Sequence, residues 1–304
     1  MKYALLCPGQ GSQFVGMGKD LFSTSEFAKK CYHKASKILE FNLEDISFNG
    51  PNENLKKTQF TQPAIYVHSY ISAIKLIKTK NISFSISAGH SLGEITALTI
   101  ANVISFEDGL KLIKIRANSM AKAGEIQPGT MAAIIGANED QINEICNQSE
   151  IVVPANINAP GQIVISGEIN AIKSAIKTAK SIGIRRALPL NVSGAFHSPL
   201  MSSARDNLSE ILNEINFNDA NFPIVQNITA KPETSGLKLK KNLLSQLENP
   251  VKWSDTIECI YNLNIDHFIE CGPGKILSGL NRRILKNSVN FNIGTTQEIN
   301  EFES

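Results

Sequence analysis

The hydrophobic and polar positions of the chain follow two periods, one typical of strands and one typical of helices. Short apolar or alternating runs predict buried strands, and apolar positions that recur roughly every three or four residues predict helices. Strands of this kind are predicted at residues 3–7, 82–88 and 267–270, and helices at residues 25–40, 63–79, 106–123, 208–215 and 237–247. Because strands and helices alternate, the sequence predicts a parallel sheet with helices on both faces.

A different order of elements is predicted in the middle of the chain. The predicted strands lie at residues 131–135, 151–156, 162–166 and 184–190, and the predicted helices at residues 139–147 and 171–181. This βαββαβ order is that of a ferredoxin-like unit. We therefore expect a small ferredoxin-like subdomain, residues 129–190, inserted in a larger α/β domain that comprises residues 1–128 and 191–304.

Composition excludes several classes of function. The 304 residues include 30 Lys and Arg against 28 Asp and Glu, and a net charge of +2 gives no basis for nonspecific nucleic-acid binding. No apolar run reaches the ~18 residues that a membrane helix needs, and the apolar N-terminal run is too short for a signal peptide. The five cysteines form no Cys-x-x-Cys pair, which favours buried, reduced thiols over a zinc site or disulfides. We expect a cytoplasmic protein that binds no metal, membrane or nucleic acid.

A Gly-x-Ser-x-Gly pattern, residues 89–93, falls where the strand at 82–88 meets a predicted helix that begins at Leu92. A sharp strand-to-helix turn would hold the Ser91 hydroxyl exposed at its tip. N–H groups at the start of the helix would face an oxyanion formed there. The pattern predicts a serine nucleophile and an α/β-hydrolase-like larger domain. The alternative is a tight turn with a capping serine.

Among the five histidines, His197 has the position expected of a general base. It follows the predicted strand at 184–190 through a loop and precedes Pro199, which suits the first turn of a helix. Catalytic groups are often displayed on such loops. The alternative is a loop histidine that caps the helix. The other histidines are His33 and His68 in predicted helices, His267 in a predicted strand, and His90, whose side chain should point away from that of Ser91.

No Asp or Glu between Ser91 and His197 lies in a convincing strand-end loop, where the acid of a hydrolase triad would stand. The simpler hypothesis is a Ser–His dyad whose histidine is oriented by a backbone or amide carbonyl.

Several segments, in order along essentially the whole chain, resemble those of the malonyl-CoA:acyl carrier protein transacylases. Together they are far more specific than any single motif. The segments are residues 8–13, 89–94, Arg116, and residues 156–162, 194–198, 246–253 and 270–274. One departure is Cys271, where relatives commonly carry an aliphatic residue.

The resemblance implies ping-pong transfer of malonyl from malonyl-CoA to the phosphopantetheine thiol of an acyl carrier protein. The acyl group would pass through an ester on Ser91, with His197 as base and no bound cofactor. The N–H groups of Gln10 and Leu92 would form the oxyanion hole. The product would supply fatty-acid or polyketide chain elongation, and we expect a discrete, monomeric enzyme.

The resemblance also implies roles for four residues around the substrate. Arg116 would bind the malonyl carboxylate with its planar, two-pronged donor face. Gln246 would hold His197 by its carbonyl. Phe196 would narrow the space for an α-methyl group, and Asn158 would line the substrate channel.

Two other classes of function stay open. An esterase or thioesterase would use the same elbow, but the missing acid and Arg116 argue against it. A non-catalytic interaction module is disfavoured because Ser91, His197 and Arg116 are all present.

A basic face could dock an acidic carrier protein. Three lysines at i, i+4 and i+7 share one side of the helix predicted at 171–181, and two arginines follow. The alternative is the solvated face of an ordinary amphipathic helix. These residues are Lys173, Lys177, Lys180, Arg185 and Arg186.

Overall fold

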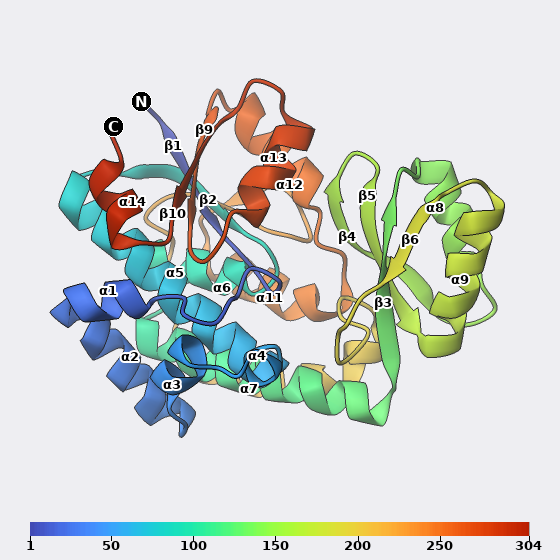
Figure 1. The fold of residues 1–304 in the computed structure, drawn as a ribbon, viewed down its shortest axis with the longest axis horizontal. Coiled ribbons are helices and arrows are strands. Elements are labelled where there is room, and N and C mark those ends of the chain that lie inside the picture. The colour runs from blue at the N-terminus through green and yellow to red at the C-terminus, as the bar shows by residue number, and fades with distance from the viewer. Residues whose placement is uncertain (304) are drawn as a thin grey trace.

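The computed structural model describes residues 1–303, in which the chain forms two β-sheets (Figure 1). The larger sheet has the strand order β10-β9-β1-β2-β7-β8, and all neighbouring pairs are parallel except β7 and β8. Its strands are β1 (Tyr3–Cys7), β2 (Phe84–Gly89), β7 (Ile224–Val225), β8 (Pro232–Glu233), β9 (His267–Cys271) and β10 (Val289–Ile293). The predicted α/β class with a largely parallel sheet is confirmed.

Helices cover both faces of this sheet, as the fully buried pattern of β1 requires. Leu5 and Cys7 pack on the side of α5 (Thr58–Lys80), α6 (Gly93–Ile100) and α7 (Phe106–Ile126). Ala4 and Leu6 face the opposite way, toward α12 (Trp253–Asn262) and α13 (Ile276–Ile284). The alternation of side chains along one strand therefore supplies two hydrophobic cores.

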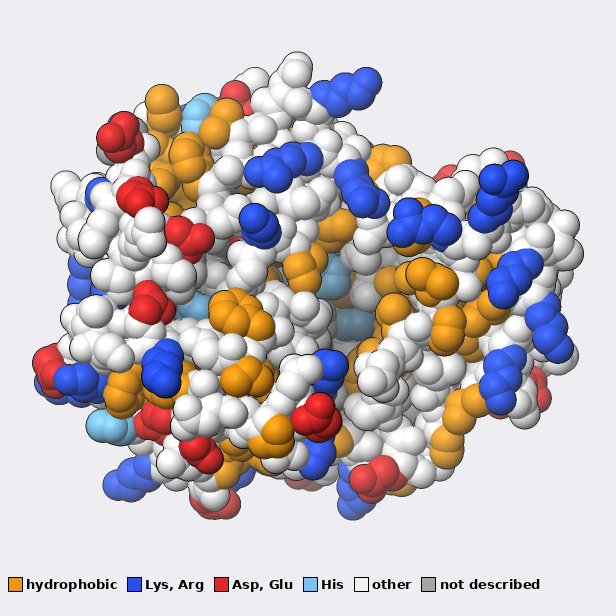
Figure 2. All heavy atoms as spheres, in the orientation of Figure 1, with side chains coloured by type: hydrophobic (Ala, Val, Ile, Leu, Met, Phe, Trp, Pro, Cys, Tyr) orange, Lys and Arg blue, Asp and Glu red, His pale blue; other side chains and the backbone are white. Residues whose placement is uncertain are grey.

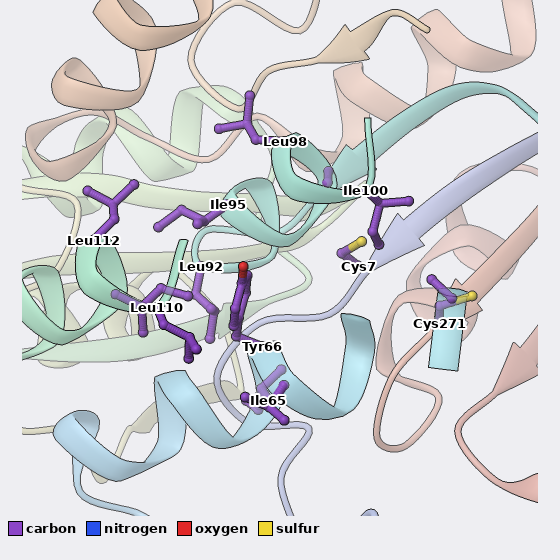
Figure 3. Packing of buried hydrophobic residues seen from close by; sticks show 14 of the residues in the cluster. Cys7, Ile65, Tyr66, Leu92, Ile95, Leu98, Ile100, Leu110, Leu112 and Cys271 are labelled. Carbon is purple, nitrogen blue, oxygen red and sulfur yellow. The ribbon is translucent and has the colours of Figure 1, made fainter. Parts of the chain in front are cut away.

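Helix α6 is buried along its whole length. Figure 3 shows Ile95 beside Leu112 of α7, with Leu98 and Tyr66 of α5 on opposite sides of α6 and Cys7 at the end of β1. A helix this short is marginal in water, so packing rather than intrinsic propensity stabilises it. Because α6 begins at Gly93, two residues after Ser91, this packing also fixes the start of the helix beside the serine.

The second sheet stands beside the first (Figure 1) and is antiparallel, with the order β4-β5-β3-β6. Its apolar core joins Ile134 and Ile165 of the sheet to Ile142 and Ile172 of two helices. The elements are β3 (Gly129–Ile135), α8 (Glu139–Cys146), β4 (Val152–Ala159), β5 (Gln162–Glu168), α9 (Ile169–Ser181) and β6 (Arg186–Pro189). Their order along the chain is βαββαβ.

Strand β4 ties the second sheet to the rest of the molecule. The N–H of Ile157 donates to the carbonyl of Val251 at 2.9 Å, and the N–H of Val251 donates to the carbonyl of Ala155 at 2.8 Å. This backbone bridge brings the end of β4 beside the loop that follows Gln246.

The remaining helices surround the larger sheet or connect its strands. They are α1 (Lys19–Thr24), α2 (Glu26–Leu39), α3 (Leu43–Phe48), α4 (Asn52–Leu55), η1 (Pro199–Ala204), α10 (Arg205–Glu214), α11 (Gly236–Ser245), η2 (Gln246–Glu248) and α14 (Thr296–Glu301). The helix predicted to begin at Pro199 is a 3₁₀ helix that continues into α10. No helix within residues 1–303 combines the length and apolarity needed to cross a bilayer.

The cysteines are only partly as expected. All five are free thiols, and Cys7, Cys31 and Cys271 are buried. Cys146 and Cys259 are half-buried, so the expectation that all five are buried is wrong for these two. Cys271, the departure from the family pattern, packs in the same core as Cys7. Burial raises the pKa of every one of these thiols, which keeps them protonated at neutral pH.

Candidate active site

The turn between β2 and α6 holds Ser91 in an unusual backbone conformation. Ser91 has a φ of 52°, in the left-handed region that residues with a side chain rarely adopt. A Cβ atom on Gly89 would lie 2.0 Å from the carbonyl carbon of Gly93, and one on Gly93 would lie 2.0 Å from the carbonyl oxygen of Cys7. Both glycines of the pattern are therefore required, because three pieces of backbone touch at this turn.

The Ser91 hydroxyl lies 2.8 Å from Nε2 of His197. On the other side of the ring, Nδ1 of His197 lies 2.9 Å from the backbone carbonyl oxygen of Gln246. A carbonyl only accepts hydrogen bonds, so Nδ1 carries the proton and Nε2 is free to accept from Ser91. Within residues 1–303, no carboxylate oxygen lies within 4.0 Å of either ring nitrogen of His197. The structure thus brings Ser91, His197 and Gln246 together.

His197 is only 3% exposed, and its surroundings oppose protonation. Burial, and then the positive charge of Arg116, lower the pKa of His197 to about 3. The imidazole is therefore neutral at physiological pH, which is the form that can take a proton from the serine.

Arg116 extends from α7 to the same point and is 1% exposed. Nη2 donates to the Ser91 hydroxyl at 3.1 Å and to Oε1 of Gln246 at 3.0 Å, and Nη1 donates to Oε1 of Gln62 at 2.8 Å. Burial lowers the pKa of Arg116 to about 10, so the guanidinium stays charged at neutral pH. Within residues 1–303 its hydrogen-bond acceptors are all neutral oxygens, which leaves a buried cation without a bonded anion.

Two backbone N–H groups near Ser91 have no hydrogen-bond partner within the described part of the chain. They belong to Gln10, in the loop after β1, and to Leu92, the residue before α6. Gly9 lies against the carbonyl of His90, which places the loop of Gln10 beside the elbow. The side chain of Gln10 accepts from Nε2 of Gln62 at 3.0 Å, and that bond links this loop to Arg116.

Asn158 and Phe196, the two remaining predicted residues, lie around the cluster formed by Ser91, His197, Arg116 and Gln246. Oδ1 of Asn158, on β4, lies 2.8 Å from Nε2 of His90, and the His90 ring lies against Trp253. His90 is thus engaged by Asn158 and Trp253 rather than by the Ser91 hydroxyl, in line with the expectation for it. Phe196 precedes His197 in the chain, is 6% exposed and packs in the hydrophobic core that also contains Leu5 and Cys7. Figure 2 shows histidine side chains at the bottom of a hollow between the two sheets of the molecule.

Sequence reasoning missed three residues of this site: Gln62, Glu94 and Asn227. Each had a usable signal. Glu94 is the only charged residue in a short helix whose other residues are apolar or threonine, and a carboxylate there is expected to be buried. Gln62 lies in the buried stretch of α5, and Asn227 is the second residue after the short strand β7, at the sheet edge where parallel folds place their sites.

This arrangement suits one class of chemistry, the transfer of an acyl group through a serine ester. Comparison with known proteins agrees with that class. Residues 4–297 match the sequence model of the acyl transferase domain, and the chain belongs to this acyl transferase family. Within the family, the predicted resemblance to malonyl-CoA:acyl carrier protein transacylases is confirmed by the relatives.

Two curated relatives carry the name malonyl CoA-acyl carrier protein transacylase. The one from Staphylococcus aureus (strain MSSA476) is 40% identical over 302 residues, which cover 98% of this chain and 97% of the relative. The one from Bacillus subtilis (strain 168) is 39% identical over 287 residues, which cover 93% of this chain and 90% of the relative.

Solved structures agree in fold over nearly the whole chain. The malonyl CoA-acyl carrier protein transacylase of Coxiella burnetii superposes with a TM-score of 0.95 at 35% identity and covers 98% of this chain and 96% of its own. A malonyl-transacylase in complex with a type II PKS acyl carrier protein gives a TM-score of 0.94 at 37% identity, with 98% of both chains covered.

The depressed pKa of His197 predicts an unusual pH profile. An ordinary histidine, with a pKa of about 6.5, would be only about one-tenth neutral at pH 5.5. Reaction of Ser91 with a neutral serine reagent should therefore keep its rate well below pH 6, where an ordinary base would already have failed. In Arg116→Ala the pH at which the rate falls on the acid side should move higher, because the largest charge that lowers the pKa of His197 is removed.

Glu94 provides the control for this profile. Burial raises the pKa of Glu94 to about 7, so a step in the rate near pH 7 belongs to that carboxyl group and should vanish in Glu94→Gln. If the rate of the Glu94→Gln variant still falls below about pH 6.5, the pKa of His197 is that of an ordinary histidine and the prediction is wrong.

Proposed function

We propose that this protein transfers the malonyl group from malonyl-CoA to the phosphopantetheine thiol of an acyl carrier protein. The observation that carries the proposal is Arg116, a buried cation 3.1 Å from the Ser91 hydroxyl whose bonded acceptors are neutral. Burying a charge without a partner is unfavourable, and a carboxylate on the incoming acyl group supplies the missing anion. A malonyl group carries such a carboxylate one carbon beyond the carbonyl that reacts. The names of the relatives agree with this substrate.

In the first half-reaction, the Ser91 oxygen attacks the thioester carbonyl carbon while His197 Nε2 takes the hydroxyl proton. The oxyanion accepts hydrogen bonds from the N–H groups of Gln10 and Leu92. The carbon–sulfur bond then breaks, and the leaving thiolate of CoA receives the proton from His197. The carbonyl of Gln246 accepts from Nδ1 throughout and stabilises the transient imidazolium.

In the second half-reaction, His197 takes the proton of the phosphopantetheine thiol, and the sulfur attacks the ester carbonyl. The ester bond breaks and the Ser91 oxygen recovers the proton. Each step exchanges one acyl bond for another and transfers one proton, with no change of oxidation state, so the proposed chemistry needs no redox cofactor. Phe196 narrows the space for an α-methyl group on the acyl chain, and Asn158 lines the channel through which the substrate reaches Ser91.

The proposal includes the architecture around the site. Residues 129–190 act as a ferredoxin-like subdomain, a view supported by the antiparallel order β4-β5-β3-β6. Residues 1–128 and 191–304 form the α/β-hydrolase-like domain that carries Ser91 and His197. The substrates enter between the two. We further propose a cytoplasmic monomer without nucleic-acid or membrane partners, whose product supplies fatty-acid or polyketide elongation.

The covalent intermediate gives the direct test. After exposure to malonyl-CoA, mass spectrometry of the intact protein should show one added malonyl group on Ser91, and Ser91→Ala should show none. His197→Ala should slow formation of the adduct by ~10²–10⁴-fold, the usual contribution of a general base. Release of free malonate as fast as transfer to the carrier would instead identify a hydrolase.

Arg116 decides which acyl group is accepted. Arg116→Ala should lower kcat/KM for malonyl-CoA by ~30- to 5,000-fold, the ~2–5 kcal/mol lost when one partner of a buried charge pair is removed. Transfer from acetyl-CoA should hold or rise, because the pocket becomes neutral while Ser91 and His197 remain. Arg116→Lys should fall between, since it keeps the charge but loses the planar donor face.

The control for this selectivity is Arg205→Ala. Arg205 is an exposed arginine paired with Glu248, and its removal should leave both substrates unaffected. An unchanged ratio of malonyl to acetyl transfer in Arg116→Ala would remove the main physical support for a malonyl substrate.

A basic surface on the second sheet fits an acidic carrier protein. Figure 2 shows Lys and Arg side chains gathered on the lobe that contains α8, α9 and β6. The five predicted residues of this surface are all exposed, and within residues 1–303 none forms an ion pair. They are Lys173, Lys177 and Lys180 of α9, with Arg185 and Arg186 at the edge strand β6.

Charge reversal separates the two half-reactions. Lys173→Glu with Lys177→Glu should lower kcat/KM for the carrier roughly ten-fold or more at low salt and weaken its dependence on salt. Formation of the malonyl adduct from malonyl-CoA should not change. Lys30→Glu with Lys37→Glu on α2, at the opposite end of the molecule (Figure 1), makes the same change in net charge and should affect neither half-reaction. Equal losses in both half-reactions would exclude this surface as the docking site.

A further inference from the structure

The turn that contains Ser91 is bonded by Asn227, a residue that follows the neighbouring strand β7 and takes no part in the proposed chemical steps. Strands β2 and β7 are parallel neighbours, with Ser87 opposite Ile224 and Ala88 opposite Val225. Continued by two residues, this register places Asn227 beside the turn that contains Ser91. Asn227 is fully buried.

The carboxamide of Asn227 bonds the backbone on both sides of the turn. Its Oδ1 accepts from the N–H of Ser91 at 2.7 Å, and its Nδ2 donates to the carbonyl of Gly89 at 2.6 Å. Nε2 of Gln246 donates to the same Oδ1 at 3.3 Å and to the carbonyl of Ser91 at 3.2 Å. One side chain thus satisfies a donor and an acceptor that the strained turn leaves outside any helix or strand ladder.

Asn227 is itself held by Glu94, the 1% exposed carboxylate in the first turn of α6. Oε2 of Glu94 accepts from the backbone N–H of Asn227 at 2.7 Å, and Oε1 accepts from Nε2 of Gln226 at 3.0 Å. The carboxylate therefore fixes the end of β7 against the helix that starts at the nucleophile.

We propose that Asn227, anchored by Glu94, is the positioning residue that holds Ser91 in its left-handed conformation. A serine with positive φ relaxes toward the extended or helical region unless the surroundings determine its conformation. The two bonds from Asn227 oppose that relaxation. They keep the Ser91 oxygen within reach of His197 and keep the N–H of Leu92 directed at the oxyanion. The inference rests on the proposed acyl transfer through Ser91.

Positioning and substrate binding can be separated by single-turnover acylation with malonyl-CoA. A displaced nucleophile slows the chemical step but leaves the binding of the acyl carboxylate to Arg116 in place. Asn227→Ala should lower the maximal rate of Ser91 acylation by ~10- to 100-fold, as expected for a misplacement of about 1 Å. The malonyl-CoA concentration at half-maximal rate should stay within about two-fold of wild type.

Two isosteric variants test whether the hydrogen bonds of Asn227 and Glu94 matter, or only the volume of their side chains. Asn227→Asp keeps the volume and the acceptor for Ser91 but turns an oxygen toward the carbonyl of Gly89, so it should be as slow as Asn227→Ala. Glu94→Gln keeps the shape but replaces one acceptor by an amide donor, and should also slow acylation. These variants answer the question if Asn227→Ala does not fold.

Asn281→Ala is the matched control. Asn281 is equally buried, donates to Oδ1 of Asn290 at 3.0 Å, and lies on α13 on the other side of the sheet. Thermal denaturation should show losses of stability comparable to those of the Asn227 variants, without any loss of acylation rate.

Reaction of Ser91 with a fluorophosphonate keeps this test independent of the substrate. If wild type forms no malonyl adduct, the proposed function fails, but a slower reaction of the Asn227 and Glu94 variants with this probe still supports the positioning role. Folded Asn227→Asp and Glu94→Gln that acylate at the wild-type rate, or whose loss lies entirely in the half-maximal concentration, overturn it.

Discussion

The site depends on the close approach of α6 to the end of β1. The helix can begin so near the strand only because Gly93 has no side chain where the carbonyl oxygen of Cys7 lies. This contact directs the first N–H groups of α6 toward Ser91, which precedes the helix in a left-handed conformation. The burial of α6 between the sheet, α5 and α7 maintains this contact. The position of the nucleophile therefore depends on the packing of the hydrophobic core.

A second constraint is the buried charge of Arg116. Its partners Gln62, Gln246 and Ser91 come from α5, the 3₁₀ helix η2 and the nucleophile turn, so three segments must be in place before the guanidinium has all its hydrogen bonds. Gln246 connects most of them, because its side chain bonds Arg116 while its backbone carbonyl orients His197. One residue thus links recognition of the acyl group to the alignment of the base.

The features that the sequence predicts are those that local chemistry determines. The glycine spacing around Ser91 and the loop position of His197 both follow from turn geometry within a few residues. The sequence does not identify Asn227 and Glu94 as site residues, because their roles arise from the pairing of β2 with β7. Strand β7 has only two residues, too few to show a hydrophobic period. Strand β10 and helices α12 and α13 were missed because their short apolar runs were not distinguished from loops. The resemblance to a family located Gln246, but only the fold shows that its backbone, not its side chain, holds His197.

The absence of an acid beside His197, among the described residues, and the presence of Arg116 are mutually consistent. A carboxylate on Nδ1 would favour the imidazolium and raise the pKa of His197. It would also place a permanent anion near Arg116 and weaken the attraction of the guanidinium for the carboxylate of a substrate. A neutral carbonyl also orients the ring, but it neither raises the pKa of His197 nor weakens the attraction of Arg116 for the substrate carboxylate. A site that selects an anionic acyl group with a buried cation therefore works best with a dyad, whereas a hydrolase of neutral esters gains from the third, acidic member.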